Sequence, residues 1–258
     1  VCAPVEHKAY LEQQLNAIYS DAVIEEVRDY NIFTPQGVIV VATGKTKGDE
    51  ILPLKTYQKD DADPLNSVIN SMSKVGEGEG LAVQFVIRSA SGAWHGRARS
   101  VVHKAHELGS LTKAFGSGFA REAMNLASEF GSAGKHKPQD QQNQLNQPKK
   151  LTAMEEEALK GIEEKNSKAG LDVNLRIVAS ALTETQAKAM LNQVAASFSQ
   201  YNYYEYGNSL SLGIRRDKDI IRDFIFRRFN ASDSFLLNTE EMASLYHFPL
   251  KNAETPNI

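Results

Sequence analysis

The chain has 258 residues, of which 41% are hydrophobic and 24% are charged, and its formal net charge is −3. This composition is typical of a globular protein, and the charge gives no overall attraction to nucleic acids or other polyanions. The single cysteine, Cys2, excludes an intramolecular disulfide and a metal site made of paired cysteines. No run approaches the roughly 20 apolar residues that cross a bilayer, and the start lacks a signal-peptide pattern. We therefore expect a soluble chain of two ordinary-sized domains.

The N-terminal part is predicted to contain one helix followed by short strands. Leu11, Leu15 and Ile18 recur at helical spacing within residues 6–19. Three later stretches are rich in β-branched or apolar side chains and are separated by turn-forming residues: 22–27, 37–42 and 51–57. This pattern predicts a strand meander that leads into the next helix.

Residues 51–90 are predicted to form a strand-helix-strand unit. Asp63 can cap its helix and Pro64 suits the first helical position. The glycine-rich stretch 76–80 ends this helix, and residues 81–87 follow as a buried strand. The buried face of the helix is predicted to consist of Leu65, Val68, Ile69 and Met72.

A second such unit is predicted over residues 172–214. Strands at 173–179 and 209–214 enclose a helix at 183–198, which opens with Thr183 and Gln186 at capping-box spacing. Because the two units have similar sizes, we interpret them as ferredoxin-like halves.

The region between the units is predicted to be a helical hairpin. Its helices span about 100–130, with a break near Gly109 or Gly116, and 152–165. Residues 131–150 are rich in Gln, Asn, Gly and Pro and contain one large apolar residue, which predicts a disordered linker. We thus predict an α+β protein with a first unit at 1–99, a hairpin at 100–170, and a second unit at 171–258 that ends in a helix.

Two motifs resemble sites of chemistry without completing them. Thr43 to Thr46 resembles the end of a phosphate-binding P-loop, but Ile39 stands where that loop needs a glycine, so we predict a hairpin turn. His103 and His106 lie three apart on a predicted helix, but only Glu107 offers a further local ligand, which favours surface histidines. We predict no catalytic, cofactor-binding or metal-binding residue, and hence no enzyme.

The segment from Arg215 to Phe229 interleaves basic and apolar residues. Such an element can face nucleic-acid phosphates or lipid headgroups. Three aspartates dilute the charge, so an ordinary amphipathic element with a solvated face is the alternative. A tyrosine cluster precedes it, which can stack on bases, pack around a turn or contact a protein. The candidate contact residues are Arg215, Arg216, Arg222, Arg227, Arg228, Tyr203 and Tyr204.

Three segments of the chain resemble one protein family. Residues 234–249, SFLLNTEEMASLYHFP, resemble the segment that closes the N-terminal region before the motor domain in ATPases of conjugation and type IV secretion and their HerA-like relatives. Residues 25–33 and 77–88 resemble the N-terminal part of such proteins in candidate-phylum bacteria. In that family a downstream P-loop domain hydrolyses ATP. Because this chain has neither the phosphate loop nor the acidic metal-binding strand, the resemblance implies an accessory domain and transfers no catalytic residue.

The leading hypothesis is therefore a non-catalytic assembly or docking domain of a membrane-associated DNA-transfer or secretion ATPase. It would act through protein contacts, either self-association or binding to secretion-channel components. We expect it in the cytoplasm at the inner face of the cell membrane, reached through segments outside this chain. The alternative is a single-stranded nucleic-acid-binding module that uses residues 215–228. A third hypothesis is an enzyme whose site is assembled in space without a familiar motif.

Overall fold

The computed structural model describes residues 1–27, 29, 31–59, 63–116, 150–203, 207–215 and 218–248. The chain divides into two compact units, Val1–Asn31 and Ile32–Ile258. The first unit holds the short helix η1 (Val5–His7) and the helix α1 (Lys8–Ile18), neither of which has a buried residue. The strand predicted at 22–27 is wrong, because these residues stay exposed without strand structure. A strand needs a paired neighbour to be stable, and the sequence pattern alone does not supply one.

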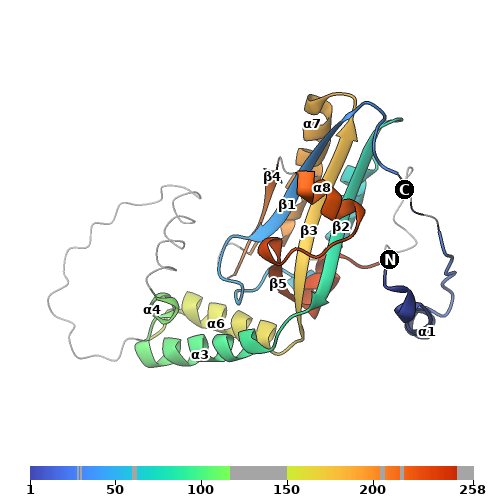
Figure 1. Ribbon diagram of the computed structural model, residues 1–258. Coiled ribbons are helices and arrows are strands. Elements are labelled where there is room, and N and C mark those ends of the chain that lie inside the picture. The colour runs from blue at the N-terminus through green and yellow to red at the C-terminus, as the bar shows by residue number, and fades with distance from the viewer. Residues whose placement is uncertain are drawn as a thin grey trace. The chain divides into compact units, whose positions relative to one another are not determined.

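The described residues of the second unit form a five-stranded antiparallel sheet (Figure 1). Four strands follow the order β2-β3-β1-β4, and β5 pairs with β3. The central strand β3 pairs with β2 along one edge, while β1 and β5 share its other edge. The strands are β1 (Val38–Thr46), β2 (Gly80–Ser89), β3 (Gly170–Ala181), β4 (Leu210–Arg215) and β5 (Phe235–Asn238).

The connections between these strands confirm the α+β prediction. The helix α2 (Leu65–Met72) connects β1 to β2, and α7 (Glu184–Ser197) connects β3 to β4. With the strand order β4-β1-β3-β2, this is the arrangement of a ferredoxin-like sheet. The second half lies where the sequence predicts it, and Thr183 caps α7 by accepting a hydrogen bond from Gln186 N.

The strand predicted at 51–57 is wrong, although its apolar residues are buried. Ile51, Leu52 and Leu54 are at most 5% exposed, but Pro53 interrupts the run. The segment pairs with no strand. Its backbone groups bond instead to partners such as Tyr201 O, which accepts from Lys55 N at 3.0 Å. A run of buried apolar residues therefore does not by itself indicate a strand, because the backbone groups of a buried segment can form their hydrogen bonds outside a sheet.

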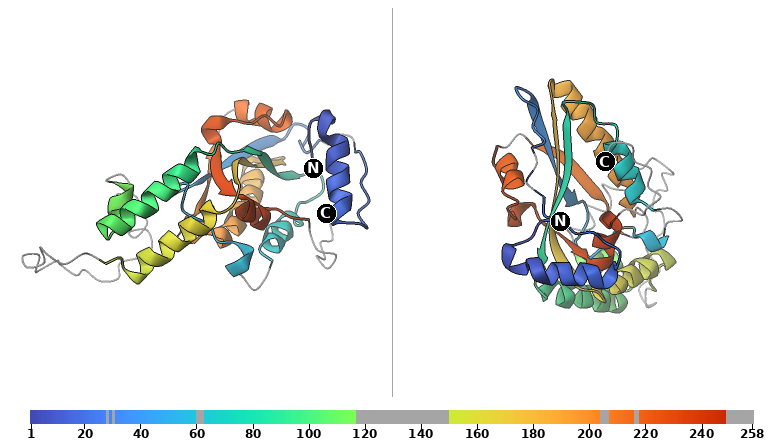
Figure 2. Two further views of the ribbon diagram at one scale, coloured as in Figure 1. Left: turned by 90° about the horizontal axis from the view of Figure 1, so that it is seen from below. Right: turned by 90° about the vertical axis from the view of Figure 1, so that its right-hand side faces the viewer.

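The two faces of the sheet are covered by different helices, as Figure 2 shows. On one face, α2 and α7 bury a large apolar core. On the other face lies α8 (Lys218–Ile225), whose Ile220 packs against Val41 and Val178. The core under α2 and α7 includes Val40, Ala42, Leu65, Val68, Leu175, Ile177, Ala187, Leu191 and Val194.

The helical hairpin is inserted between β2 and β3. Its described helices are α3 (Ala93–Leu108), α4 (Leu111–Phe115) and α6 (Ala153–Asn166). The predicted break lies at Gly109, whose φ of 58° suits glycine at a helix end. Residues 117–149, which contain most of the predicted linker, lie outside the described part of the chain. The hairpin has its own apolar cluster, made of Ile51, Leu52, Ala98, Val101, Ala105, Leu111, Ala158, Leu159 and Ile162.

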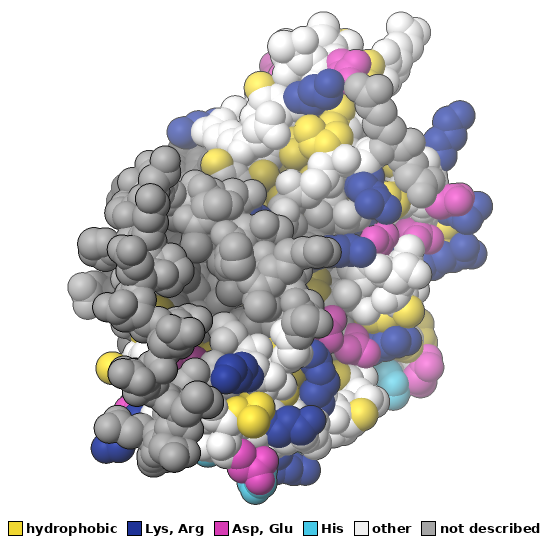
Figure 3. Space-filling view, turned by 90° about the vertical axis from the view of Figure 1, so that its left-hand side faces the viewer, with side chains coloured by type: hydrophobic (Ala, Val, Ile, Leu, Met, Phe, Trp, Pro, Cys, Tyr) yellow, Lys and Arg dark blue, Asp and Glu magenta, His cyan; other side chains and the backbone are white. Residues whose placement is uncertain are grey.

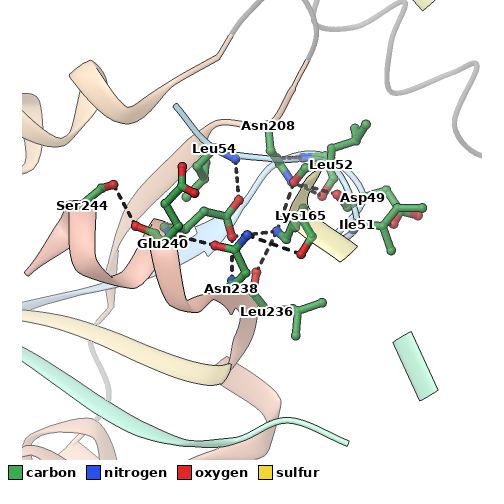
Figure 4. A network of polar contacts seen from close by, with 12 residues as sticks. Asp49, Ile51, Leu52, Leu54, Lys165, Asn208, Leu236, Asn238, Glu240 and Ser244 are labelled. Atoms are coloured by element: carbon green, nitrogen blue, oxygen red, sulfur yellow. Dashed lines mark hydrogen bonds and ion pairs between the residues drawn. The ribbon is translucent and has the colours of Figure 1, made fainter. Parts of the chain in front are cut away.

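A buried ion pair connects the hairpin to the sheet (Figure 4). Lys165 on α6 and Glu241 on α9 (Thr239–Leu245) lie 3.1 Å apart, with side chains 0% and 1% exposed. Lys165 also donates to the carbonyls of Leu52 and Leu236, both at 3.2 Å. Glu241 accepts from Leu54 N at 2.7 Å and from Asn238 N at 2.8 Å. Both charges are therefore hydrogen-bonded by several groups, which a buried ion pair requires.

Candidate functional site

The predicted basic segment forms α8, and its apolar side faces the sheet. Ile221 and Phe224 add to the packing that Ile220 makes on Val41 and Val178. The ring of Phe33 meets that of Phe224 edge to face, with centroids 6.2 Å apart. The amphipathic pattern is thus explained first by this packing, and the charged side of α8 is turned away from the sheet.

The C-terminal end of α8 is a Schellman motif with arginine in the position that usually holds glycine. Arg228 N donates to Asp223 O at 2.9 Å, and Arg227 N donates to Phe224 O at 3.2 Å. Arg227 has a φ of 52°, in the left-handed region that side chains disfavour. The backbone therefore carries strain at this residue, and surrounding contacts must hold it in place.

Three polar side chains of the sheet hold this strained turn. Gln84 on β2 donates to Phe224 O at 3.0 Å. Arg176 on β3 donates to Arg228 O at 2.7 Å and to Gln84 Oε1 at 2.9 Å. Asn174, two residues earlier on the same side of β3, bonds to both backbone groups of Asn230, at 2.7 Å and 2.8 Å. Backbone groups before and after Arg227 are thus fixed from the sheet.

The guanidinium of Arg176 is an unusually buried part of this support. The residue is 2% exposed. Burial lowers the pKa of its guanidinium, and the nearby charges of Asp223 and Asp233 partly offset that effect. Such a group is stable in the interior only when its donors have acceptors, and here those acceptors include the turn itself.

The residues of the turn project outward. We call Ile225, Phe226, Arg227 and Arg228 the α8 turn. Ile225 is 43% exposed and Phe226 is 64% exposed, and both arginines are exposed. The guanidinium of Arg228 lies 5.5 Å from the centroid of the Phe226 ring. The α8 turn therefore combines exposed apolar side chains with two cations on a backbone that the sheet holds rigid.

Two other predicted arginines lie on the same side of the sheet as α8. Arg215 pairs in register with Val41, which packs beneath α8, and its guanidinium is 4.0 Å from Asp233. Arg222 forms an ion pair with Asp219 at 2.9 Å on the exposed surface of α8. Arg216 lies outside the described residues.

The predicted tyrosine platform is not joined to these arginines. Tyr203 follows η3 (Phe198–Tyr201), whose buried rings belong to the core under α7, on the opposite side of the sheet from α8. Its hydroxyl accepts from Lys59 Nζ at 2.9 Å, and that ammonium is 4.5 Å from the ring centroid. Tyr204 lies outside the described residues. A single surface made of Tyr203 and the arginines is therefore excluded.

The P-loop-like residues also have a structural explanation. The hairpin turn predicted at Thr43 to Thr46 is wrong, because β1 continues through Thr46. Gly44 lies within the strand, where an added Cβ would come within 2.9 Å of the Leu175 side chain. Gly44 thus permits close packing between strands and does not belong to a phosphate-binding loop.

The other candidate groups do not converge on a site within the described chain. His103 forms an exposed contact with Glu107 at 3.5 Å. Among the described residues, no group of three or more His, Cys, Asp or Glu residues could hold a metal ion, and no helix is long and apolar enough to span a membrane. One surface hollow, of about 280 Å³, has a lining that includes Thr34, Leu182 and Gln186. Another, of about 390 Å³, has a lining that includes Lys45, Arg97 and Phe235. Neither lining includes a residue of α8.

Sequence reasoning missed the exposed Phe226 and the side chains that support the turn. The signal for the support is an alternation in β3, where Asn174 and Arg176 interrupt the apolar residues Val173, Leu175 and Ile177 at a spacing of two. Polar residues on one face of a buried strand indicate that something polar covers that face.

The chain matches, over residues 2–258, the model of a family described as Domain of unknown function (DUF8128). It therefore belongs to this family. No curated protein matches the chain, and no solved structure matches it.

Proposed function

We propose that this chain is a non-catalytic assembly or docking domain of a membrane-associated DNA-transfer or secretion ATPase, and that it acts through protein contacts at the inner face of the membrane. The observation that supports a docking role is the α8 turn. Its aromatic ring and arginines are exposed together on a backbone that Gln84, Arg176 and Asn174 hold in place.

The composition of the α8 turn matches that of binding hot spots. Aromatic residues and arginine are enriched among the residues that dominate interface energies. A rigid surface also loses less conformational entropy when it binds, so more of the contact energy appears as affinity. Phe226 is 64% exposed and Ile225 is 43% exposed, so the ring offers the larger apolar contact area of the two.

The ATPase context rests on the resemblance of residues 234–249. The described part of this segment forms β5 and α9, and both are fixed to the rest of the unit. Asn238 and Glu241 form a capping box at the start of α9, and Glu241 is also the buried partner of Lys165. Because β5 and α9 are part of the folded unit, a domain that follows them in the chain would be held in a defined position relative to this one.

Photo-crosslinking tests this proposal directly. A photoreactive phenylalanine analogue at position 226, in cells that make the natural protein, should yield crosslinks to the ATPase assembly or its channel. The control position is Leu182, which is 70% exposed and lies beyond the end of β3. The same crosslinks from both positions, or none from position 226, would count against docking through the α8 turn. The complete reading frame should also encode a GxxxxGK[ST] motif and an apolar span.

A single-stranded nucleic-acid-binding module is the second candidate, and the exposed arginines of residues 215–228 favour it. The sheet face that related architectures use for base stacking is covered here by α8, and Tyr203 lies on the other side. In addition, Figure 3 shows basic and acidic side chains interspersed among the described residues of the face it presents. Fluorescence anisotropy of a labelled oligonucleotide at low salt separates the candidates. Binding that Arg227→Glu with Arg228→Glu abolishes would favour this function.

A further inference from the structure

We propose that the α8 turn binds the anionic phospholipid headgroups of a bilayer surface. This inference rests on the proposed function, since it names the chemistry that one surface of the docking domain contacts. The proposed function places the domain near the membrane only through segments outside this chain. The further proposal is that the folded domain itself contacts the membrane.

The charges of the turn fit phosphate groups. Guanidinium groups bind phosphate oxygens in a two-pronged geometry and are weakly hydrated, which favours contact at a headgroup layer. Arg227 and Arg228 are exposed within the turn, whereas Arg222 on the preceding helical turn is 55% exposed but already paired with Asp219 at 2.9 Å. The α8 turn contains no carboxylate of its own. Each arginine near an anionic surface strengthens binding by about fivefold.

The apolar part of the turn favours a bilayer over an extended peptide or a nucleic acid. Phe226 and Ile225 project from the end of a helix and are 64% and 43% exposed. An extended peptide or a base binds best in a groove or on a series of aromatic rings, and the turn offers one ring. The interfacial layer of a bilayer instead accepts a single protruding ring flanked by cations.

The backbone of Arg227 gives independent support. Its φ of 52° is a conformation in which glycine is favoured, yet the chain carries arginine there. Strain of this kind at an exposed residue points to a role for the side chain. The sheet contacts to Phe224 O and Arg228 O hold the turn in this conformation from both sides of Arg227, and the Arg227 guanidinium itself adds a longer bond to Ile225 O at 3.4 Å.

Vesicle co-sedimentation with the full chain tests the proposal. We expect binding to vesicles of phosphatidylcholine mixed with phosphatidylglycerol and little binding to phosphatidylcholine alone. Arg227→Gly should weaken binding about fivefold while keeping the fold, because glycine suits the backbone there. Phe226→Ser should weaken it as well. The matched control is Arg99→Gln, which removes one exposed positive charge from α3.

Three outcomes would overturn the proposal: no binding to anionic vesicles, equal binding to both kinds of vesicle, or an equal loss with Arg99→Gln and Arg227→Gly. Binding of a single-stranded oligonucleotide without vesicle binding would also overturn it, in favour of the nucleic-acid module. The proposed docking function has its own test. Specific protein crosslinks from position 226 without vesicle binding would reject the lipid contact alone, and vesicle binding without crosslinks would reject the protein contact.

Discussion

Arg227 occupies a backbone position where its side chain costs stability. Glycine at a φ of 52° would relieve the strain of the left-handed conformation, although it also makes the unfolded chain more flexible. We expect Arg227→Gly to raise the free energy of unfolding by about 0.5 to 1 kcal/mol. Urea denaturation of the wild-type chain and the variant measures this difference in the free energy of unfolding. Arg228→Gly is the control and should destabilise, because Arg228 lacks a positive φ. Destabilisation by both variants would show that Arg227 is not strained.

Truncating the buried side chain of Lys165 should be strongly destabilising. Removing it leaves the carboxylate of Glu241 buried without its cation, since Glu241 is 1% exposed. Lys165→Met should therefore lower the free energy of unfolding by about 3 to 5 kcal/mol. Adding Glu241→Gln should cost less than the sum of the single variants, because no uncompensated charge remains. If urea denaturation gave losses in the free energy of unfolding that add up in the double variant, the two charges would not stabilise each other.

At the scale of the element, α9 is held by an ion pair that depends on pH. Glu240 accepts from Thr56 Oγ1 at 2.7 Å and forms an ion pair with Lys168 at 2.8 Å. Burial opposes ionisation of Glu240, but the bonds from Lys168 and Thr56 outweigh it and lower the pKa of Glu240 below its ordinary value of 4.5. The folded carboxylate thus holds its proton less tightly than the unfolded one. Its stabilising contribution is present above that value and is lost as the pH falls through the folded-state pKa.

Comparing the wild-type chain with Glu240→Gln checks this contribution. The difference between their free energies of unfolding should be largest near neutral pH and should shrink as the pH falls below about 4.5. The control is the Lys168→Met variant, which lacks the ion pair. In that variant Glu240→Gln should change the free energy of unfolding by less. A difference that stays constant with pH would indicate that Glu240 acts only through packing.

Elements with local signals were predictable, whereas elements defined by distant partners were not. Thr183 marks a helix start through a cap that the structure confirms. The segment containing Pro53 is buried by two apolar clusters and bonded to distant groups, so its apolar residues resembled a strand. The arginines of α8 were identified as surface candidates from their spacing. The exposure of Phe226 depends on Gln84, Asn174 and Arg176, which are far away in the sequence.

At the scale of the molecule, the sheet and the hairpin of the second unit share one buried connection. The segment at Ile51 to Leu54 contributes to the apolar clusters of both parts. Lys165 on the hairpin bonds to Leu236 O on β5 and to Glu241 on α9. Because these contacts must break together, separating the hairpin from the sheet exposes a charged pair and two apolar surfaces at once.

We therefore expect the hairpin and the sheet to unfold as one cooperative unit. In native-state hydrogen exchange, amides of α6 and of β3 should open with the same free energy, within about 1 kcal/mol of global unfolding. Lys165→Met should separate the two, so that α6 amides exchange through a cheaper local opening while β3 amides follow global unfolding. If α6 already opens well below β3 in the wild-type chain, the buried pair does not couple them. The hairpin would then be an independently opening arm on a more stable sheet.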